Sequence, residues 1–173
     1  MSLREELRTT APAEPSVLLP SAWRWVAPED ADSLPSPAHR RQLREARILA
    51  GGGSTLALGI HEGGRHPASL VAVARRASPE GFAAFVAQRH ADAGAAHLGE
   101  DRRIVRWATE RTATEPTKRL HYLAMVPGTR RTRAVEWIAA ISPKGAPLPD
   151  DTVLLWAAAM DAVAGTLEWR RGA

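Results

Sequence analysis

The chain has 173 residues, of which 45% are hydrophobic and 24% are charged, and its formal net charge is +4. This composition excludes an intrinsically disordered chain and predicts a single domain large enough to bury a core. There is no cysteine, which excludes disulfides, thiolate metal sites and a cysteine nucleophile.

The N-terminal segment is predicted to be a tail that leads into a strand and a helix. Residues 1–15 are polar and proline-rich, which predicts a flexible tail with a short helix at Leu3–Arg8. We therefore expect the domain to occupy residues 16–173. The apolar run 16–19 predicts its first strand, and residues 37–50, with leucine and alanine spaced among arginines, predict its first helix.

A glycine run separates this helix from a predicted hairpin. Gly51–Gly53 is expected to end the helix, because glycine tolerates the left-handed backbone common at that point. The following GGGST is no phosphate loop, since such a loop follows a strand and carries a lysine. Residues 55–60 and 67–74 then predict two strands, joined by the glycine-containing turn 61–66.

Residues 78–93 carry the clearest helix signal in the chain. Ser78 is a suitable N-cap, Glu80 lies in the first turn where the helix dipole favours an acid, and Gly94 is a suitable stop. A stripe at helical spacing consists of Phe82, Phe85, Val86 and His90.

The C-terminal part predicts three consecutive strands and a closing helix. The strands are residues 102–108, 118–126 and 133–142, and the helix is capped by Asp150 or Asp151 and stays apolar as far as Leu167. The complete order is β-α-β-β-α-β-β-β-α. It predicts an α+β domain with an antiparallel sheet of about six strands and about three helices.

Positive charge is concentrated between residues 102 and 133. This stretch holds nine basic and two acidic side chains, a local charge of +7. Such a patch attracts phosphates or acidic proteins, although charged strands also simply protect an exposed sheet edge. The candidate binding residues in and beside it are Arg103, Arg106, Arg119, His121, Arg130, Arg131 and Arg133.

Two histidine-containing segments invite a functional interpretation. Alternation along a strand places Arg119 and His121 on one face, where they could converge with Arg106 on an anion, unless that face is merely solvated. His61 and His66 lie five residues apart in a glycine turn, which is typical of an exposed hairpin tip rather than a zinc site. We predict no metal site, no cofactor and no catalytic residues, since no Ser–His–Asp set or carboxylate pair has suitable spacing.

The six tryptophans are expected mostly in the core between sheet and helices. Trp156 and Trp169 are expected on the last helix. Trp23 and Trp25 follow the first strand, and they could instead border an exposed apolar groove. Tryptophan and arginine are enriched at binding hot spots, so these two residues are the candidate apolar contacts.

The sequence resembles a known fold family over residues 16–169. The matching segments are the opening SVLLP and SAWRWVAP, the LALGIHEGGRHPASLVAVA hairpin, the PEGFAAFVAQRHA helix and a closing meander that ends in LEW. In this order they resemble the PsbP-like or DcrB-like α/β/α fold, in its small soluble actinobacterial form. The resemblance implies a non-enzymatic role, because members include photosystem accessory proteins and chaperones for effectors of bacterial secretion systems.

We therefore expect an adaptor or chaperone-like protein, near a secretion or toxin system, that binds an acidic or amphipathic segment of another protein. One alternative is a nucleic-acid or phosphate binder, and another is a small enzyme or small-molecule binder with a pocket between the sheet and the last helix. An uncovered sheet edge would also allow a homodimer. Residues 1–16 lack the apolar core of a secretory signal and no run of about 18 apolar residues occurs, so we expect a cytoplasmic protein without membrane contact.

Overall fold

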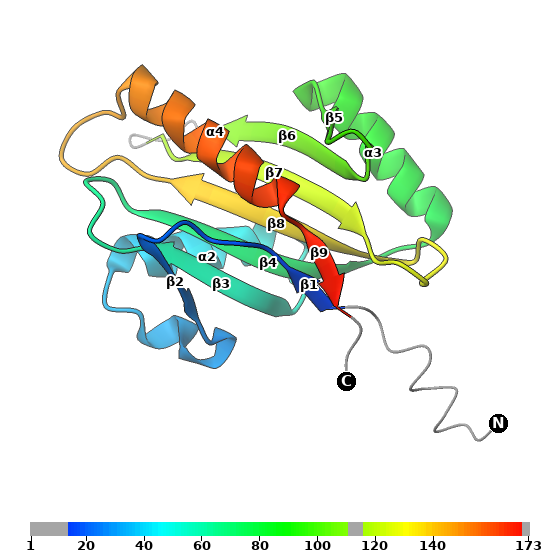
Figure 1. The fold of residues 1–173 in the computed structure, drawn as a ribbon, viewed down its shortest axis with the longest axis horizontal. Coiled ribbons are helices and arrows are strands. Elements are labelled where there is room, and N and C mark those ends of the chain that lie inside the picture. The colour runs from blue at the N-terminus through cyan, green and yellow to red at the C-terminus, as the bar shows by residue number, and fades with distance from the viewer. Residues whose placement is uncertain (1–13, 111–115, 171–173) are drawn as a thin grey trace.

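The structure is a computed structural model that describes residues 14–110 and 116–170. Its centre is a seven-stranded antiparallel sheet, and a separate two-stranded ribbon pairs β1 (Glu14–Ser16) with β9 (Glu168–Arg170) (Figure 1). From edge to edge the sheet contains β2 (Trp23–Val26), β3 (Thr55–His61), β4 (Ala68–Arg76), β8 (Arg133–Ile141), β7 (Lys118–Met125), β6 (Ile104–Glu110) and β5 (Ala96–Leu98). The predicted α+β class with an antiparallel sheet is confirmed. The sheet has seven strands because β2 and β5 join the five predicted strands from residue 55 onward, whereas the strand predicted at residues 16–19 is not part of it.

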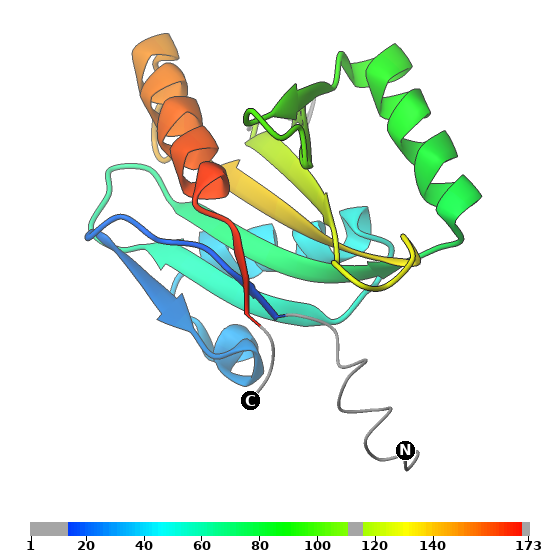
Figure 2. The ribbon, with the colours of Figure 1, turned by 45° about the vertical axis from the view of Figure 1, so that its right-hand side comes forward.

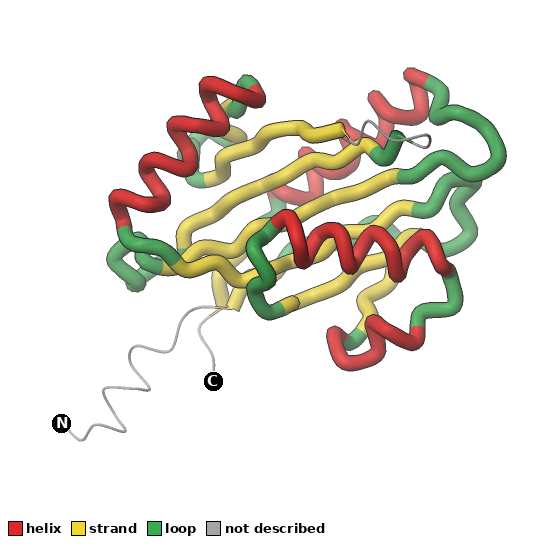
Figure 3. Tube along the Cα trace, turned by 180° about the vertical axis from the view of Figure 1, so that it is seen from behind, coloured by secondary structure: helices red, strands yellow, loops and turns green. Residues whose placement is uncertain are grey.

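Helices cover both faces of this sheet. The helix α4 (Asp150–Gly165) and the β1–β9 ribbon lie over one face, which we call the front face (Figure 1). The helices α2 (Pro37–Leu49) and α3 (Pro79–Ala93) lie over opposite halves of the other face, the back face (Figure 3). A short 3-10 helix, η1 (Pro28–Ser33), connects β2 to α2. In the parts of the chain that the structure covers, no helix combines the length and the apolar character needed to cross a membrane.

Three apolar clusters hold these layers together. On the front face, Trp156 and Met160 of α4 pack with Tyr122 and Trp137 of the sheet. Two further clusters occupy the back face, and their members alternate with the front-face residues along each strand. One lies under α2 and includes Leu43, Leu58, Ile60 and Val71, and the other lies under α3 and includes Phe82, Val105, Trp107 and Leu123.

The most local predictions are confirmed. The Ser78 hydroxyl accepts a hydrogen bond from the Gly81 amide at 3.0 Å, and Gly94 ends α3 with a φ of 58°. β3 and β4 pair as the predicted hairpin. Gly51 and Gly52 both follow α2 with a φ of 76°, as expected of residues that stop a helix.

The predicted first strand at residues 16–19 is wrong. Only Ser16 belongs to β1, which also includes Glu14 and Pro15 of the expected tail, and pairs with the C-terminal β9. The Trp23 amide then donates to the Pro20 carbonyl at 2.9 Å, a turn that directs the chain into β2 at the sheet edge. The helix expected at Leu3–Arg8 lies outside the described residues.

The predicted ends of the last helix also need correction. Pro149 occupies the N-cap position without a side-chain hydrogen bond, and Asp150 and Asp151 lie in the first turn. α4 ends at Gly165, and Trp169 therefore belongs to β9. The Thr166 hydroxyl explains this end, because it donates to the Val163 carbonyl at 2.6 Å and accepts from the Leu18 amide at 2.8 Å.

Candidate functional site

A broad hollow of the described chain lies where β6 begins and β7 ends. It has a volume of about 1110 Å³ and extends from α3 past the β7–β8 turn to the C-terminal end of α4 and β9. We call it the end groove, and Figure 2 brings α3 and this turn forward. Its apolar lining includes Val86, Leu98, Val105, Met125, Leu167 and Trp169.

One wall of the end groove is a face of α3 with small side chains. Phe82 is the only residue of this helix that is fully buried among its neighbours. Ala83, Val86 and Ala87 follow at helical spacing and line the groove, and both alanines are exposed. An amphipathic helix normally buries a broad apolar stripe, so α3 presents apolar surface that the rest of the described chain does not cover.

The rim of the end groove is basic. Four arginines line it, against the two carboxylates of Glu100 and Asp101, which gives a net charge of +2 with neutral histidines. Asp101 is already paired with Arg103, whose hydrogen bonds hold the pKa of that carboxyl below its ordinary value. The other three arginines, which form no ion pair with any described residue, are Arg102, Arg130 and Arg131.

Only part of the predicted basic patch reaches this groove. Arg103, Arg130 and Arg131 line it, whereas Arg133 at the start of β8 does not. Arg106 is on the front face, where its Nε lies 2.7 Å from Asp161 of α4. The charge concentrated in the sequence is therefore distributed over both faces and one end of the sheet.

The anion site expected from Arg106, Arg119 and His121 does not form. Arg119 and His121 do share the back face, but Arg106 lies opposite Tyr122 on the front face. The alternative of a solvated face is also wrong, because both residues are buried: Arg119 pairs with Glu45 of α2, and His121 is 2% exposed.

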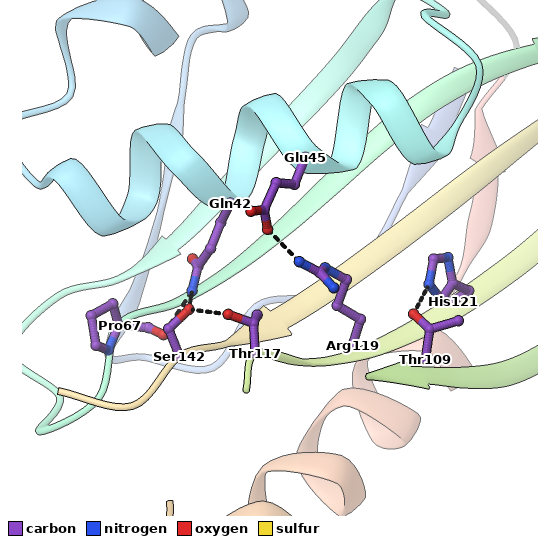
Figure 4. A network of polar contacts seen from close by, with 8 residues as sticks. All are labelled: Gln42, Glu45, Pro67, Thr109, Thr117, Arg119, His121 and Ser142. Carbon is purple, nitrogen blue, oxygen red and sulfur yellow. Dashed lines mark hydrogen bonds and ion pairs between the residues drawn. The ribbon is translucent and has the colours of Figure 1, made fainter. Parts of the chain in front are cut away.

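The back face instead contains a polar network that ties α2 to the sheet (Figure 4). The Gln42 amide donates to the Ser142 hydroxyl at 2.8 Å and to the Pro67 carbonyl at 3.0 Å. The Ser142 hydroxyl is also 3.1 Å from the Thr117 hydroxyl, and Arg119 reaches Glu45 from β7. These contacts fix the position of α2 over its half of the sheet.

A second back-face chain of polar contacts joins the neighbouring strands β6, β7, β8 and β4, and no sequence pattern predicts it. His121 Nε2 is 2.8 Å from the Thr109 hydroxyl, and its Nδ1 is 2.8 Å from a Glu136 oxygen (Figure 4 shows the first contact). Arg75 pairs with the same carboxylate, and Trp107 stacks on the imidazole with ring centroids 4.9 Å apart. The order hydroxyl, imidazole, carboxylate is that of a nucleophilic triad.

This chain fits a structural role better than a catalytic one. Glu136 is 1% exposed and both imidazole nitrogens of His121 have protein partners. Neither the end groove nor the smaller hollow beside the start of α4 is lined by Thr109, His121 or Glu136. A substrate bound in either of these two hollows would therefore not reach the Thr109 hydroxyl.

The two candidate tryptophans lie at the opposite edge of the sheet from the end groove. Trp23 packs against His61, with ring centroids 5.5 Å apart, and contacts the front-face core. Trp25 is 45% exposed and lies 6.3 Å from the Trp137 ring. Because β2 and β5 are the two edges of the sheet, the predicted apolar and basic contacts do not form one site.

The histidine turn brings no metal ligands together. His61 ends β3, and His66 is buried in the turn before β4. Within residues 14–110 and 116–170, no three histidine, aspartate or glutamate side chains are placed to hold a metal ion. His90 and His97 do approach each other at the end groove, with ring centroids 5.6 Å apart.

Comparisons with known proteins give little further guidance. No protein-family model matches the chain, and no curated protein is significantly similar to it. One similar solved structure is that of LpqN, described as involved in cell envelope biogenesis of Mycobacterium tuberculosis, with a TM-score of 0.47, 12% identity and coverage of 98% of each chain. A likeness at this level supports no functional argument, so the PsbP-like resemblance remains a prediction.

Proposed function

We propose that this chain is a non-catalytic binding protein that holds an acidic, partly apolar segment of another polypeptide in the end groove. The observation that carries the proposal is the combination of an uncovered apolar wall on α3 with three rim arginines that pair with no described residue. Apolar contact supplies affinity in such a groove, and complementary charge supplies specificity and a faster encounter.

The openness of the α3 wall favours a polypeptide over a small molecule. Small-molecule sites enclose most of the ligand surface. Here Ala83, Ala87 and His90 are all exposed along one side of the groove. A nucleic acid is less well supported, because Arg106 and Arg119 neutralise Asp161 and Glu45 inside the fold instead of forming a continuous basic track.

A cytoplasmic location and a role beside a secretion or toxin system belong to this proposal as well. The support for that role is the resemblance to the PsbP-like or DcrB-like fold over residues 16–169.

The test compares a groove variant with a matched control on the same helix. Ala83→Glu combined with Ala87→Glu places bulk and negative charge in the groove, whereas Ala84→Glu changes an exposed alanine that does not line it. All three positions are exposed on α3, so the fold should tolerate the changes.

Tagged wild type and both variants are used to capture proteins from the native host at low and moderate salt. We expect one stoichiometric protein that wild type and the control retain and the groove variant loses. The purified partner should then shift the NMR signals of α3 and Met125 in the isotope-labelled protein. Equal capture by the groove variant and the control would contradict the proposal, and so would co-purification of nucleic acid or a small ligand alone.

A further inference from the structure

Backbone conformation singles out the three rim arginines. Among the described residues, positive φ values at non-glycine positions occur at Arg102 (54°), Arg130 (50°) and Arg131 (61°), and all three line the end groove. Left-handed backbone is unfavourable for a side chain with a Cβ, and glycine or asparagine adopts it at lower cost. Strained residues of this kind cluster at ligand-binding sites, where the side chain is needed in a fixed position.

The two turns that carry these arginines are held by specific hydrogen bonds. In the β7–β8 turn, the Thr129 hydroxyl donates to the Val126 carbonyl at 2.7 Å, and the Thr132 hydroxyl donates to the Thr129 carbonyl at 2.6 Å. In the β5–β6 turn, the Arg102 carbonyl lies 3.0 Å from His97 Nδ1. The backbone of each arginine is therefore fixed, although the guanidinium groups are exposed.

Three of the four arginines at this rim form no ion pair within the described parts of the chain. Arg103 is neutralised by Asp101, but Arg102, Arg130 and Arg131 form no ion pair with any residue in the described ranges. Guanidinium groups bind carboxylates in a bidentate geometry, and two turns with three such groups suit more than one carboxylate. Directly beside them lie Met125, Val126 and the apolar face of α3.

We propose that Arg102, Arg130 and Arg131 form a preorganised anchor for two adjacent carboxylates on the polypeptide segment that occupies the end groove. The inference rests on the proposed function and names the chemistry by which that partner is chosen. Arg102 enters the site here for a structural reason, since its charge alone did not distinguish it from the other arginines.

The test uses two fluorescein-labelled peptides of equal length, built from leucine and alanine with one central Glu-Glu pair or one central Gln-Gln pair. Binding is followed by fluorescence anisotropy at low and moderate salt. The variant combines Arg102→Asn, Arg130→Asn and Arg131→Asn, because asparagine removes the charge but tolerates the left-handed backbone. The control combines Arg44→Asn, Arg65→Asn and Arg76→Asn, which removes the same charge from exposed positions outside the groove.

We expect wild type and the control to bind the Glu-Glu peptide about tenfold more tightly than the Gln-Gln peptide, and the rim variant to lose this preference. The Tm of the rim variant should be unchanged or higher, by up to about 3 °C, because asparagine relieves backbone strain. The inference is overturned if the rim variant still prefers the Glu-Glu peptide. It is also overturned if the Tm of the rim variant falls by many degrees, because the arginines would then have a structural role.

The peptides also separate this inference from the proposed function. If wild type binds both peptides equally and Ala83→Glu with Ala87→Glu abolishes binding, the groove holds polypeptides but the anchor does not exist. If wild type binds neither peptide and captures no groove-dependent partner, both the inference and the proposed function are wrong.

Discussion

Tyr122 offers the sharpest test of the packing beneath α4. It is the only tyrosine in the chain and is 1% exposed in the front-face core. Its hydroxyl donates to Asp161 at 2.7 Å, and the same carboxylate oxygen accepts from Arg106 at 2.7 Å. Burial, and then the hydrogen bond to the Asp161 carboxylate, raise the pKa of Tyr122 far above its ordinary value.

The raised pKa makes stability depend on alkaline pH with a definite sign. Below about pH 10 the phenol is protonated in both states, so its contribution to stability is complete. Above that pH the unfolded chain loses the proton and the folded protein keeps it. The free energy of unfolding should therefore fall by about 1.4 kcal/mol between pH 9 and pH 11 from this residue alone. Tyr122→Phe should abolish this decline.

At neutral pH the same substitution removes a hydrogen bond to a charged acceptor. Such bonds contribute about 1.5–3 kcal/mol, but the Asp161 side chain is 32% exposed and keeps Arg106, so we expect a loss of about 1–2 kcal/mol. Urea unfolding of wild type and variant at several pH values measures both effects. Near-ultraviolet absorbance reports tyrosinate from Tyr122 alone. Tyrosinate formed near pH 10 while the circular dichroism is still native would refute the argument.

Two further predictions concern buried charge on the back face. Glu136→Gln should lower the free energy of unfolding, measured in urea, by about 2–4 kcal/mol, because the imidazole of His121 and the guanidinium of Arg75 lose their charged partner. Glu80→Gln at an exposed position on α3 should change the free energy of unfolding little. Equal effects of the two substitutions would contradict this assignment. Burial lowers the pKa of His39, so the folded protein keeps this imidazole neutral at pH values where the unfolded chain already protonates it. The contribution of neutral His39 to the free energy of unfolding is therefore complete above about pH 6.5 and is lost as pH falls through the lowered pKa. His39→Gln should therefore flatten the acid side of the stability profile, and unchanged profiles would show that other groups cause it.

The sequence predicts those parts of the fold that depend on neighbouring residues. The cap at Ser78, the stop at Gly94 and the β3–β4 hairpin each need only a few consecutive residues, and all are present. The β1 strand could not be placed in this way. Its partner β9 is at the other end of the chain, and short strands take their register from that partner.

The roles of the basic residues could not be read from the sequence, because their partners are distant. Arg106 is 55 residues from Asp161, and Arg119 is 74 residues from Glu45. Strand register also decides the face. Trp107 lies opposite His121, so Arg106 is directed to the front face and away from Arg119. Local charge therefore located the basic stretch correctly but could not show that two of its members are used inside the fold.

The end groove was missed because no single segment encodes it. Its lining comes from α3, β5, two turns and the end of α4, which only the folded chain brings together. The sequence did contain one signal. An apolar stripe at helical spacing is normally buried, yet of Phe82, Phe85, Val86 and His90 on α3 only Phe82 is fully buried.

The contrast between the two back-face helices explains why the groove lies beside α3. α2 buries four residues and is fixed by Gln42 and Glu45, whose partners are on the sheet and the β3–β4 turn. α3 is two residues longer and buries only Phe82, with Phe85 covered by Arg75 and Arg89. Helices in proteins take most of their stability from the packing of one face. A segment bound in the end groove would therefore add apolar packing to α3, which the fold itself packs at only one fully buried residue.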